Sequence, residues 1–224
     1  MNLEIMGILL SFAFVFLLIL CATIVQKMLK LSSEFSRKII HIAVGNWVLL
    51  AYYFFSNWLM ASIVPAAFIV INYLSYRYKI FKAMELDDKN PGTVYYSISL
   101  TILTVLTFYF SPVLTLPYLG IMAMVWGDGF AAVIGRKYPI KILRGVKSLG
   151  GMLAFIIFTF AASVVYLILI RPQDDVGFML ATAGTIATGG SVIELYSMKN
   201  IDNLTVPLGI GIVLGFLEIG KVFV

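Results

Sequence analysis

The sequence has little of what a water-soluble domain needs. Of its 224 residues, 12% are charged and 61% are hydrophobic, whereas soluble domains carry about twice that charged fraction. It has one cysteine, Cys21, which excludes an intramolecular disulfide. It also has one histidine, His41, which cannot form the His/Cys cluster that zinc prefers. We therefore predict a membrane protein without a zinc site.

Two nucleotide-binding motifs are also missing from the sequence. There is no G-x-x-x-x-G-K-[ST] and no G-x-G-x-x-G, which excludes a Walker A loop and a dinucleotide fingerprint. The net charge of +5 reflects 16 Lys and Arg against 11 Asp and Glu. Such an excess is expected of cytoplasmic loops in a membrane protein, so we predict no nucleic-acid partner.

Long apolar runs are abundant. Eight segments are long enough to cross a bilayer as helices, so we predict an all-α, polytopic membrane bundle of about eight transmembrane helices without a soluble domain. The predicted spans are 4–26, 39–56, 58–76, 94–110, 117–134, 149–170, 176–194 and 205–223. The first has Glu4 and no cation in its flank, so we predict a retained helix rather than a secretion signal.

The cations fall on one side of this arrangement. Of the 16 Lys and Arg residues, 14 lie in alternate connections: Lys27, Lys30, Arg37, Lys38, Arg77, Lys79, Lys82, Lys89, Arg136, Lys137, Lys141, Arg144, Lys147 and Lys199. The exceptions are Arg171 and Lys221. Because Lys and Arg are retained in the cytoplasm, we predict that these connections are cytoplasmic and that both termini are external.

One acid interrupts an apolar segment. In "MVWGDGFAAVIGRKY" (124–138), Asp128 lies between Gly127 and Gly129. A carboxylate near mid-membrane costs about 3 kcal/mol on insertion scales, and such residues usually carry function. The structural alternative is a hydrogen bond between helices. Glycines on both sides let a ligand or a neighbouring backbone approach closely, which favours a metal or phosphate site.

Cations follow this acid along the chain. Arg136 would lie about 12 Å from Asp128 along a continuous helix. The loop after it ends in "KSLGG" (147–151) at the start of a new helix. A helix N-terminus attracts anions, so this pentapeptide is a candidate anion cradle. Lys141 and Arg144 are interpreted as topology signals.

Five blocks resemble the dolichol kinase/phytol kinase family of CTP-dependent lipid-alcohol kinases. In chain order they are "SRKIIHIAVG", "NPGTVYYSIS", "WGDGFAAVIGRKY", "KSLGG" and "IELYSMKNIDNLTVPLG". The resemblance covers about residues 37–209 and implies a kinase-like core over 27–224, with the first helix as a peripheral addition to a single membrane domain, 1–224. One departure is "KSLGG", where relatives commonly have K-S-x-E-G.

The resemblance implies phosphorylation of a long-chain alcohol by CTP and a divalent cation, for which Mg²⁺ suits carboxylate and phosphate oxygens. Asp128, Lys147 and Asp202 are the predicted catalytic residues, with Asp128 as metal ligand or base. Asp128, Glu194 and Asp202 are the predicted metal ligands. The predicted nucleotide-binding residues are Arg37, Lys38, His41, Gly92, Thr93, Arg136, Lys137, Ser148 and Asn203.

Simpler roles exist for several of these residues. Asp202 and Asn203 could cap the last helix, Thr93 could cap the fourth, and a single histidine such as His41 is often structural. Gly211 and Gly215, four residues apart, indicate close helix packing.

Other functions share some of these features. A phosphatidate cytidylyltransferase would use the same CTP, metal and membrane face, but this chain lacks that family's H-G-G signature. A CTP-dependent diacylglycerol kinase is a non-isoprenoid option. A transporter would show polar groups in both halves of the bundle, and a lipid-binding scaffold gives no reason for Asp128. The predicted partners are CTP, the bilayer and an isoprenoid alcohol such as phytol, geranylgeraniol, farnesol or dolichol.

The cation distribution makes a topological prediction. Accessibility tags inserted in 77–92 and 136–147 should be cytosolic, and a tag in 112–116 should be external. Labelling with a membrane-impermeant reagent in intact cells measures this. An external 136–147 loop would contradict the predicted site, because CTP is cytosolic.

Overall fold

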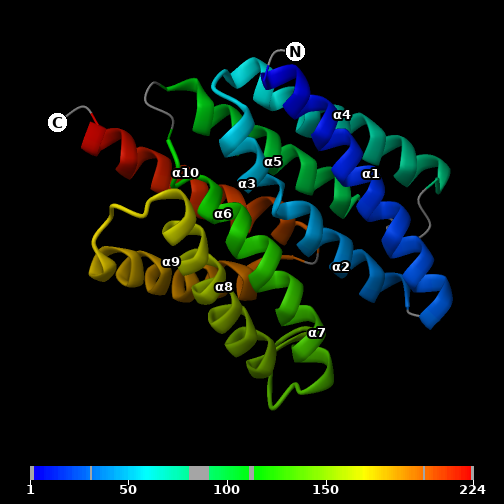
Figure 1. Cartoon of the computed structure of the whole chain (residues 1–224). Coiled ribbons are helices and arrows are strands. Elements are labelled where there is room, and N and C mark those ends of the chain that lie inside the picture. The colour runs from blue at the N-terminus through cyan, green and yellow to red at the C-terminus, as the bar shows by residue number, and fades with distance from the viewer. Residues whose placement is uncertain (1–2, 31, 81–90, 111–113, 199, 223–224) are drawn as a thin grey trace. The chain divides into compact units, whose positions relative to one another are not determined.

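The computed structural model describes residues 3–30, 32–80, 91–110, 114–198 and 200–222 (Figure 1). The cations Lys82, Lys89 and Lys199 lie outside these residues. The first half contains α1 (Leu3–Leu29), α2 (Ser33–Gly45), α3 (Trp47–Phe54), α4 (Trp58–Tyr78) and α5 (Gly92–Tyr109). The second half contains α6 (Tyr118–Met122), the π-helix η1 (Ala123–Asp128), α7 (Gly129–Lys137), β1 (Ile142–Arg144), β2 (Lys147–Ser148), α8 (Leu149–Ile170), α9 (Val176–Tyr196) and α10 (Asp202–Val222).

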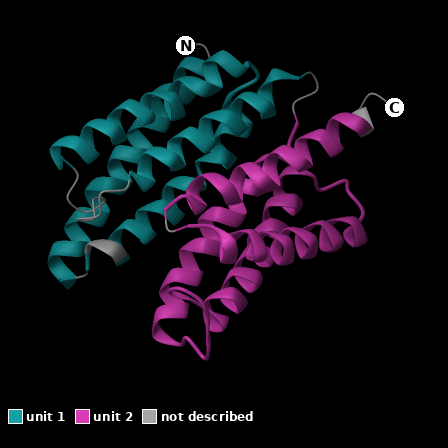
Figure 2. Ribbon diagram, turned by 180° about the vertical axis from the view of Figure 1, so that it is seen from behind, with its two compact units in different colours: residues 1–113 teal, residues 114–224 magenta. Residues whose placement is uncertain are grey.

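The chain divides into two compact units, residues 1–113 and 114–224 (Figure 2). The first, unit 1, contains α1 to α5. The second, unit 2, contains the helices from α6 to α10 and the β1–β2 hairpin. The prediction that 1–224 form a single domain remains a prediction.

The helical membrane fold is confirmed. Among the described residues, seven helical segments are long and apolar enough to cross a bilayer, including Tyr118–Lys137, which joins α6, η1 and α7. The second predicted span differs, because it is broken into α2 and α3. Asn46 lies at the break, and its side-chain amide donates to the Ile42 carbonyl at 2.7 Å. The Gly45–Asn46 pair thus breaks the helix within an apolar run whose sequence predicts one continuous span.

Side chains cap several helix starts, which would otherwise leave amides without partners. Asn57 accepts from the amides of Leu59 and Met60 at the start of α4. Asp175 accepts from the Phe178 amide at the start of α9. These polar residues set the boundaries between apolar helices.

A β-hairpin between α7 and α8 was not predicted. β1 and β2 pair antiparallel, with Arg144 opposite Lys147. Gly145 begins the two-residue turn with φ 56°, a value that glycine adopts readily and that hairpin turns require. The hairpin holds Lys147 directly before α8.

In unit 1, α1 is tied to its neighbours by polar contacts. The Trp47 indole donates to the Ser11 hydroxyl at 2.7 Å, and Trp47 is 1% exposed. Near the N-terminus, the Glu4 carboxylate accepts from the backbone amides of Ser56 and Asn57, each at 3.1 Å. The prediction that the first helix is peripheral to the kinase-like core remains a prediction, but within unit 1 this helix is packed and hydrogen-bonded.

In unit 2, Glu218 on α10 anchors the segment that enters α6. Its buried carboxylate accepts from the backbone amides of Thr115 and Leu116 at 2.9 and 2.8 Å. It also pairs with Arg171, which contacts Asp174 at 2.5 Å. Burial lowers the pKa of the Arg171 guanidinium, but hydrogen bonds and charge from Asp174 and Glu218 more than offset this, so its pKa is raised and it stays charged.

Replacing Glu218 should therefore destabilise unit 2. Glu218→Gln keeps the size but removes the charge that Arg171 and two amides contact, and a hydrogen bond to a charged group contributes about 1.5–3 kcal/mol. We expect a loss of about 2 kcal/mol in the free energy of unfolding, measured in detergent. Asp175→Asn is the control, because Asn caps a helix as well as Asp does. Equal stability of the two variants would contradict this role for Glu218.

Candidate active site

Asp128 lies at the end of η1, where the helix widens to π geometry before α7 begins. Single π-turns inside α-helices are frequent at functional sites. The residue is 5% exposed. A Cβ atom on the preceding Gly127 would lie 2.2 Å from the Thr159 hydroxyl and 2.8 Å from the Phe155 ring. Gly127 therefore allows this segment to pack against α8, which places the acid inside the helices of unit 2.

Two further acids lie on either side of the connection between α9 and α10. Glu194 lies in the last turn of α9, and Asp202 is the first residue of α10. Each is 7% exposed. Asn200, in the turn between them, adopts a left-handed conformation with φ 68°.

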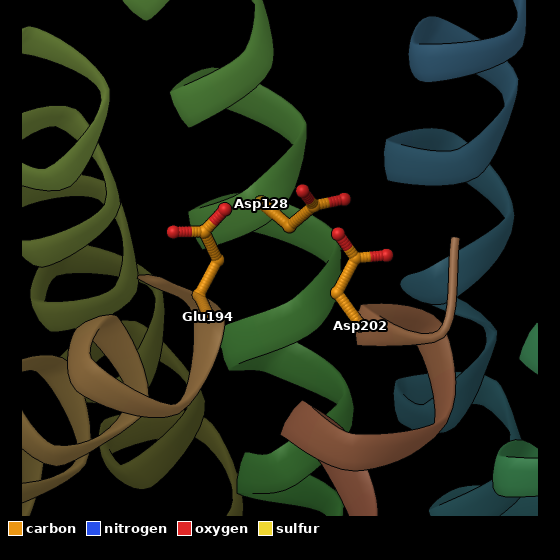
Figure 3. Close-up of side chains that lie close together, drawn as sticks. All are labelled: Asp128, Glu194 and Asp202. Carbon is orange, nitrogen blue, oxygen red and sulfur yellow. The ribbon is translucent and has the colours of Figure 1, made fainter. Parts of the chain in front are cut away.

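The three carboxylates converge on one point (Figure 3). One oxygen each of Asp128, Glu194 and Asp202 can be chosen so that all lie within 4.8 Å of one another. These residues were the predicted metal ligands, and the structure brings all three together from three separate helical elements.

Lys147 joins this cluster from β2. Its ammonium lies 2.7 Å from a carboxylate oxygen of Glu194 and 3.5 Å from one of Asp202, and it donates to the Glu194 backbone carbonyl. Within the part of the chain that the structure describes, Lys147 thus pairs with two of the three carboxylates. Because carboxylates buried close together are costly without positive charge nearby, such a group favours a bound cation.

The donor set fits a divalent cation. Magnesium binds carboxylate oxygens at about 2.0–2.1 Å, so two ligands of one ion lie at most about 4.2 Å apart. The separations within the cluster, up to 4.8 Å, need only a small contraction to reach that range. The carboxylates of Asp128, Glu194 and Asp202 would be the ligands.

The start of α8 corrects one expectation. The first-turn amides of Leu149 and Gly150 donate to the carbonyls of Lys141 and Pro139 at 2.8 and 3.1 Å, and Gly151 donates to the Ser148 hydroxyl at 3.2 Å. A Cβ atom on Gly150 would lie 1.9 Å from the Tyr138 carbonyl oxygen. These groups fix the hairpin to α8 and do not form the open anion cradle that the sequence indicated. Nucleotide binding by Ser148 remains untested.

The other predicted nucleotide-binding residues of unit 2 lie in two places. Asn203 is buried beside the cluster, and its backbone amide donates to an Asp202 carboxylate oxygen at 3.1 Å. Arg136 and Lys137 are exposed in the last turn of α7, where the Lys137 ammonium lies 5.2 Å from the Tyr138 ring centroid. Their contact with a nucleotide remains a prediction.

The predicted residues of unit 1 belong to a different group. Arg37, His41 and Thr93 line one pocket. Lys38 is half-buried on α2, and Gly92 is the buried first residue of α5. Sequence reasoning missed three other polar residues of this pocket, Asn72, Tyr96 and Ser97. The signal for Asn72 was an amide within an apolar helix.

The fold and the site together define a class: an integral membrane protein of apolar helices with buried carboxylates gathered around one lysine. No protein-family model and no solved structure matches the chain. A phytol kinase from Synechocystis sp. is 33% identical over 201 residues, which cover 85% of this chain and 82% of the relative. A probable chloroplastic phytol kinase 1 from Glycine max is 28% identical over 199 residues, which cover 80% of this chain and 65% of the relative. The chain belongs to the phytol kinase family of lipid-alcohol kinases.

The pairing of Lys147 with Glu194 and Asp202 makes a prediction. Lys147→Met keeps the length of the side chain but leaves three carboxylates together, so without divalent cations it should lower the free energy of unfolding by about 3 kcal/mol. Added Mg²⁺ should stabilise the variant more than the wild type, and a ligand at a hundred times its Kd contributes about 2.7 kcal/mol.

Thermal unfolding in detergent, with EDTA or with MgCl₂, measures both effects. Lys141→Met is the matched control, because Lys141 is an exposed cation of the same connection. Equal responses of the Lys147 and Lys141 variants to Mg²⁺ would contradict a cation site at this cluster.

Proposed function

We propose that this protein is a CTP-dependent kinase of an isoprenoid membrane alcohol, with phytol as the first substrate to test. We further propose that Asp128, Glu194 and Asp202 bind Mg²⁺ at its active site. The observation that carries the proposal is the convergence of these three buried carboxylates, two of which pair with Lys147. Membership of the phytol kinase family supports the reaction class and the substrate.

In this reaction the hydroxyl oxygen of the alcohol forms a bond to the γ-phosphorus of CTP. The bond from that phosphorus to the β–γ bridging oxygen breaks, CDP leaves, and the hydroxyl proton passes to a base. A bound divalent cation supplies charge neutralisation for the triphosphate. In such transfers the protein acts mainly by positioning the reactants and by balancing charge.

The residues of unit 2 divide these tasks. Asp128 is proposed above as a metal ligand, and its alternative role is the base that takes the proton. Lys147 lies between Glu194 and Asp202 and holds both carboxylates in place. Arg136 and Lys137 are the proposed further contacts of the triphosphate, Arg through its two-pronged guanidinium and Lys as a point charge.

We also propose that the hairpin end of unit 2 faces the cytoplasm and that both termini are external. The cations of 136–147 support this orientation. It requires α2 and α3 to cross the membrane together. At 1.5 Å per residue, residues 33–54 reach about 33 Å if the two helices are aligned, enough for a hydrocarbon core of about 30 Å.

Identifying both products tests the proposal. Purified protein in nanodiscs is incubated with phytol, Mg²⁺ and CTP labelled in either its α- or its γ-phosphate. We expect a lipid monophosphate that carries only the γ-label, together with CDP. A CDP-lipid with release of pyrophosphate would instead identify a cytidylyltransferase, and faster turnover with ATP would overturn CTP as the donor. Phosphatidate, diacylglycerol, farnesol and geranylgeraniol complete the substrate panel.

Asp128→Asn links this activity to the cluster. The change preserves size and removes charge, so the variant should stay folded and lose activity by a factor of order 100 or more, as for a lost base or metal ligand. Raising the Mg²⁺ concentration should partly restore a lost ligand but not a lost base. Asp175→Asn, at the far end of α9 from Glu194, is the control and should keep its activity. Wild-type turnover by a folded Asp128→Asn protein would contradict a catalytic or metal-binding role for Asp128.

A further inference from the structure

Unit 1 contains a pocket among α1 to α5 whose empty volume, including the part open to the surroundings, is about 600 Å³. Apolar side chains form most of its wall: Val15, Ile19, Ile40, Val44, Trp47, Val64, Pro65, Phe68 and Leu100. Its six remaining lining residues are Arg37, His41, Asn72, Thr93, Tyr96 and Ser97.

The polar and apolar residues of the pocket are separated along the helices. On α5, Thr93, Tyr96 and Ser97 precede Leu100, and on α4, which runs toward the start of α5, Phe68 precedes Asn72. At 1.5 Å per residue, the step from Thr93 to Leu100 is about 10 Å. The pocket therefore has one polar end and an apolar interior, the arrangement expected for a lipid with a single polar group.

One buried hydroxyl at the polar end is a candidate contact for a ligand. Tyr96 is 6% exposed, and its buried hydroxyl has no hydrogen-bond partner among the residues that the structure describes. Its ring lies against His41, with 4.4 Å between ring centroids. Beside it, the Asn72 amide donates to the Thr93 carbonyl at 3.2 Å and to the Ser97 hydroxyl at 2.8 Å. Because buried polar atoms almost always have a hydrogen-bond partner, an oxygen atom of a bound ligand would supply the partner of the Tyr96 hydroxyl.

We propose that this pocket binds the hydrocarbon chain of a single-chain isoprenoid lipid, with its hydroxyl or phosphate oxygen at Tyr96 and His41. The proposal rests on the proposed function for the lipid class but concerns residues outside the carboxylate cluster. Arg37, half-buried at the polar end, suits a phosphate better than a hydroxyl, so the alcohol and its monophosphate are the two forms to compare.

This assignment changes the role expected of three residues. Arg37, His41 and Thr93 were predicted to contact the nucleotide. A triphosphate requires several cations or polar donors, whereas Arg37 is the one lysine or arginine among the described residues that line the pocket. The wall beyond these residues is aromatic and aliphatic, which favours a lipid chain over a nucleotide.

A photoreactive ligand tests the proposal without relying on turnover. The probe is phytol with a diazirine in its chain, added to protein in nanodiscs, with labelled peptides located by mass spectrometry. Asp128→Asn is labelled beside the wild type so that binding is measured without turnover. We expect labelling of α4 and α5 near Phe68 and Leu100, which excess unlabelled phytol or phytyl monophosphate suppresses. The stronger competitor identifies the form that binds more tightly.

Two variants connect the labelling to the pocket. Leu100→Trp fills the apolar interior and should reduce labelling at least tenfold, whereas Ile102→Trp, on the exposed face of the same helix, should not. Tyr96→Phe keeps the fold and removes the hydroxyl, so about five- to tenfold more phytol should be needed for competition.

The outcomes separate this proposal from the proposed function. Labelling that phytol suppresses in a protein without kinase activity would support the pocket and contradict the kinase. Normal kinase activity with labelling that neither phytol nor Leu100→Trp reduces would overturn the pocket alone. Suppression by CTP and not by phytol would also overturn it, because the pocket would then bind the nucleotide.

Discussion

The balance of charge around Lys147 is the constraint on which unit 2 depends. Three buried carboxylates and one ammonium share a site among apolar helices, where an unbalanced charge costs several kcal/mol. The helices that carry them must therefore stay close enough for the charges to meet. Lys147 satisfies this for α9 and α10, because it contacts Glu194 in the last turn of one and Asp202 at the start of the other.

Small residues allow the same helices to approach one another. A Cβ atom on Gly120 of α6 would lie 2.3 Å from the Pro207 carbonyl oxygen and 2.8 Å from the Gly211 nitrogen of α10. Helix association in membranes relies on such close backbone contacts, since lipid tails compete equally well for apolar side chains. Glu218 then fixes the other end of α10 to the entry of α6. Close packing of α6 against α10, together with the hydrogen bonds of Glu218, thus fixes the position of the helical segment that carries Asp128.

Hydropathy and charge predicted the parts of this structure that are local in the chain. Apolar length predicted the spans, and acids in or beside apolar segments, together with the family resemblance, predicted the members of the cluster. The helix break at Asn46 was not predicted, because a Gly-Asn pair inside an apolar run leaves the mean hydropathy high. The role of Glu218 also escaped, since its partners Thr115 and Arg171 lie 103 and 47 positions away. The pocket of unit 1 could not be predicted, because its wall combines residues from five helices.

A kinase for a membrane alcohol must bind its two substrates in surroundings of opposite polarity. The nucleotide brings several negative charges that require cations, while the alcohol brings an apolar chain that favours a dry wall and a single polar contact. A site suited to one is unfavourable for the other, because a charged cluster excludes hydrocarbon and an apolar pocket does not solvate phosphate. The two units differ in this respect. Unit 2 gathers Asp128, Glu194, Asp202 and Lys147, whereas the pocket of unit 1 is lined mainly by apolar side chains and contains the Tyr96 hydroxyl, which has no hydrogen-bond partner among the described residues. Under the proposed function, the buried charges of unit 2 would suit the nucleotide and the apolar pocket of unit 1 would suit the alcohol.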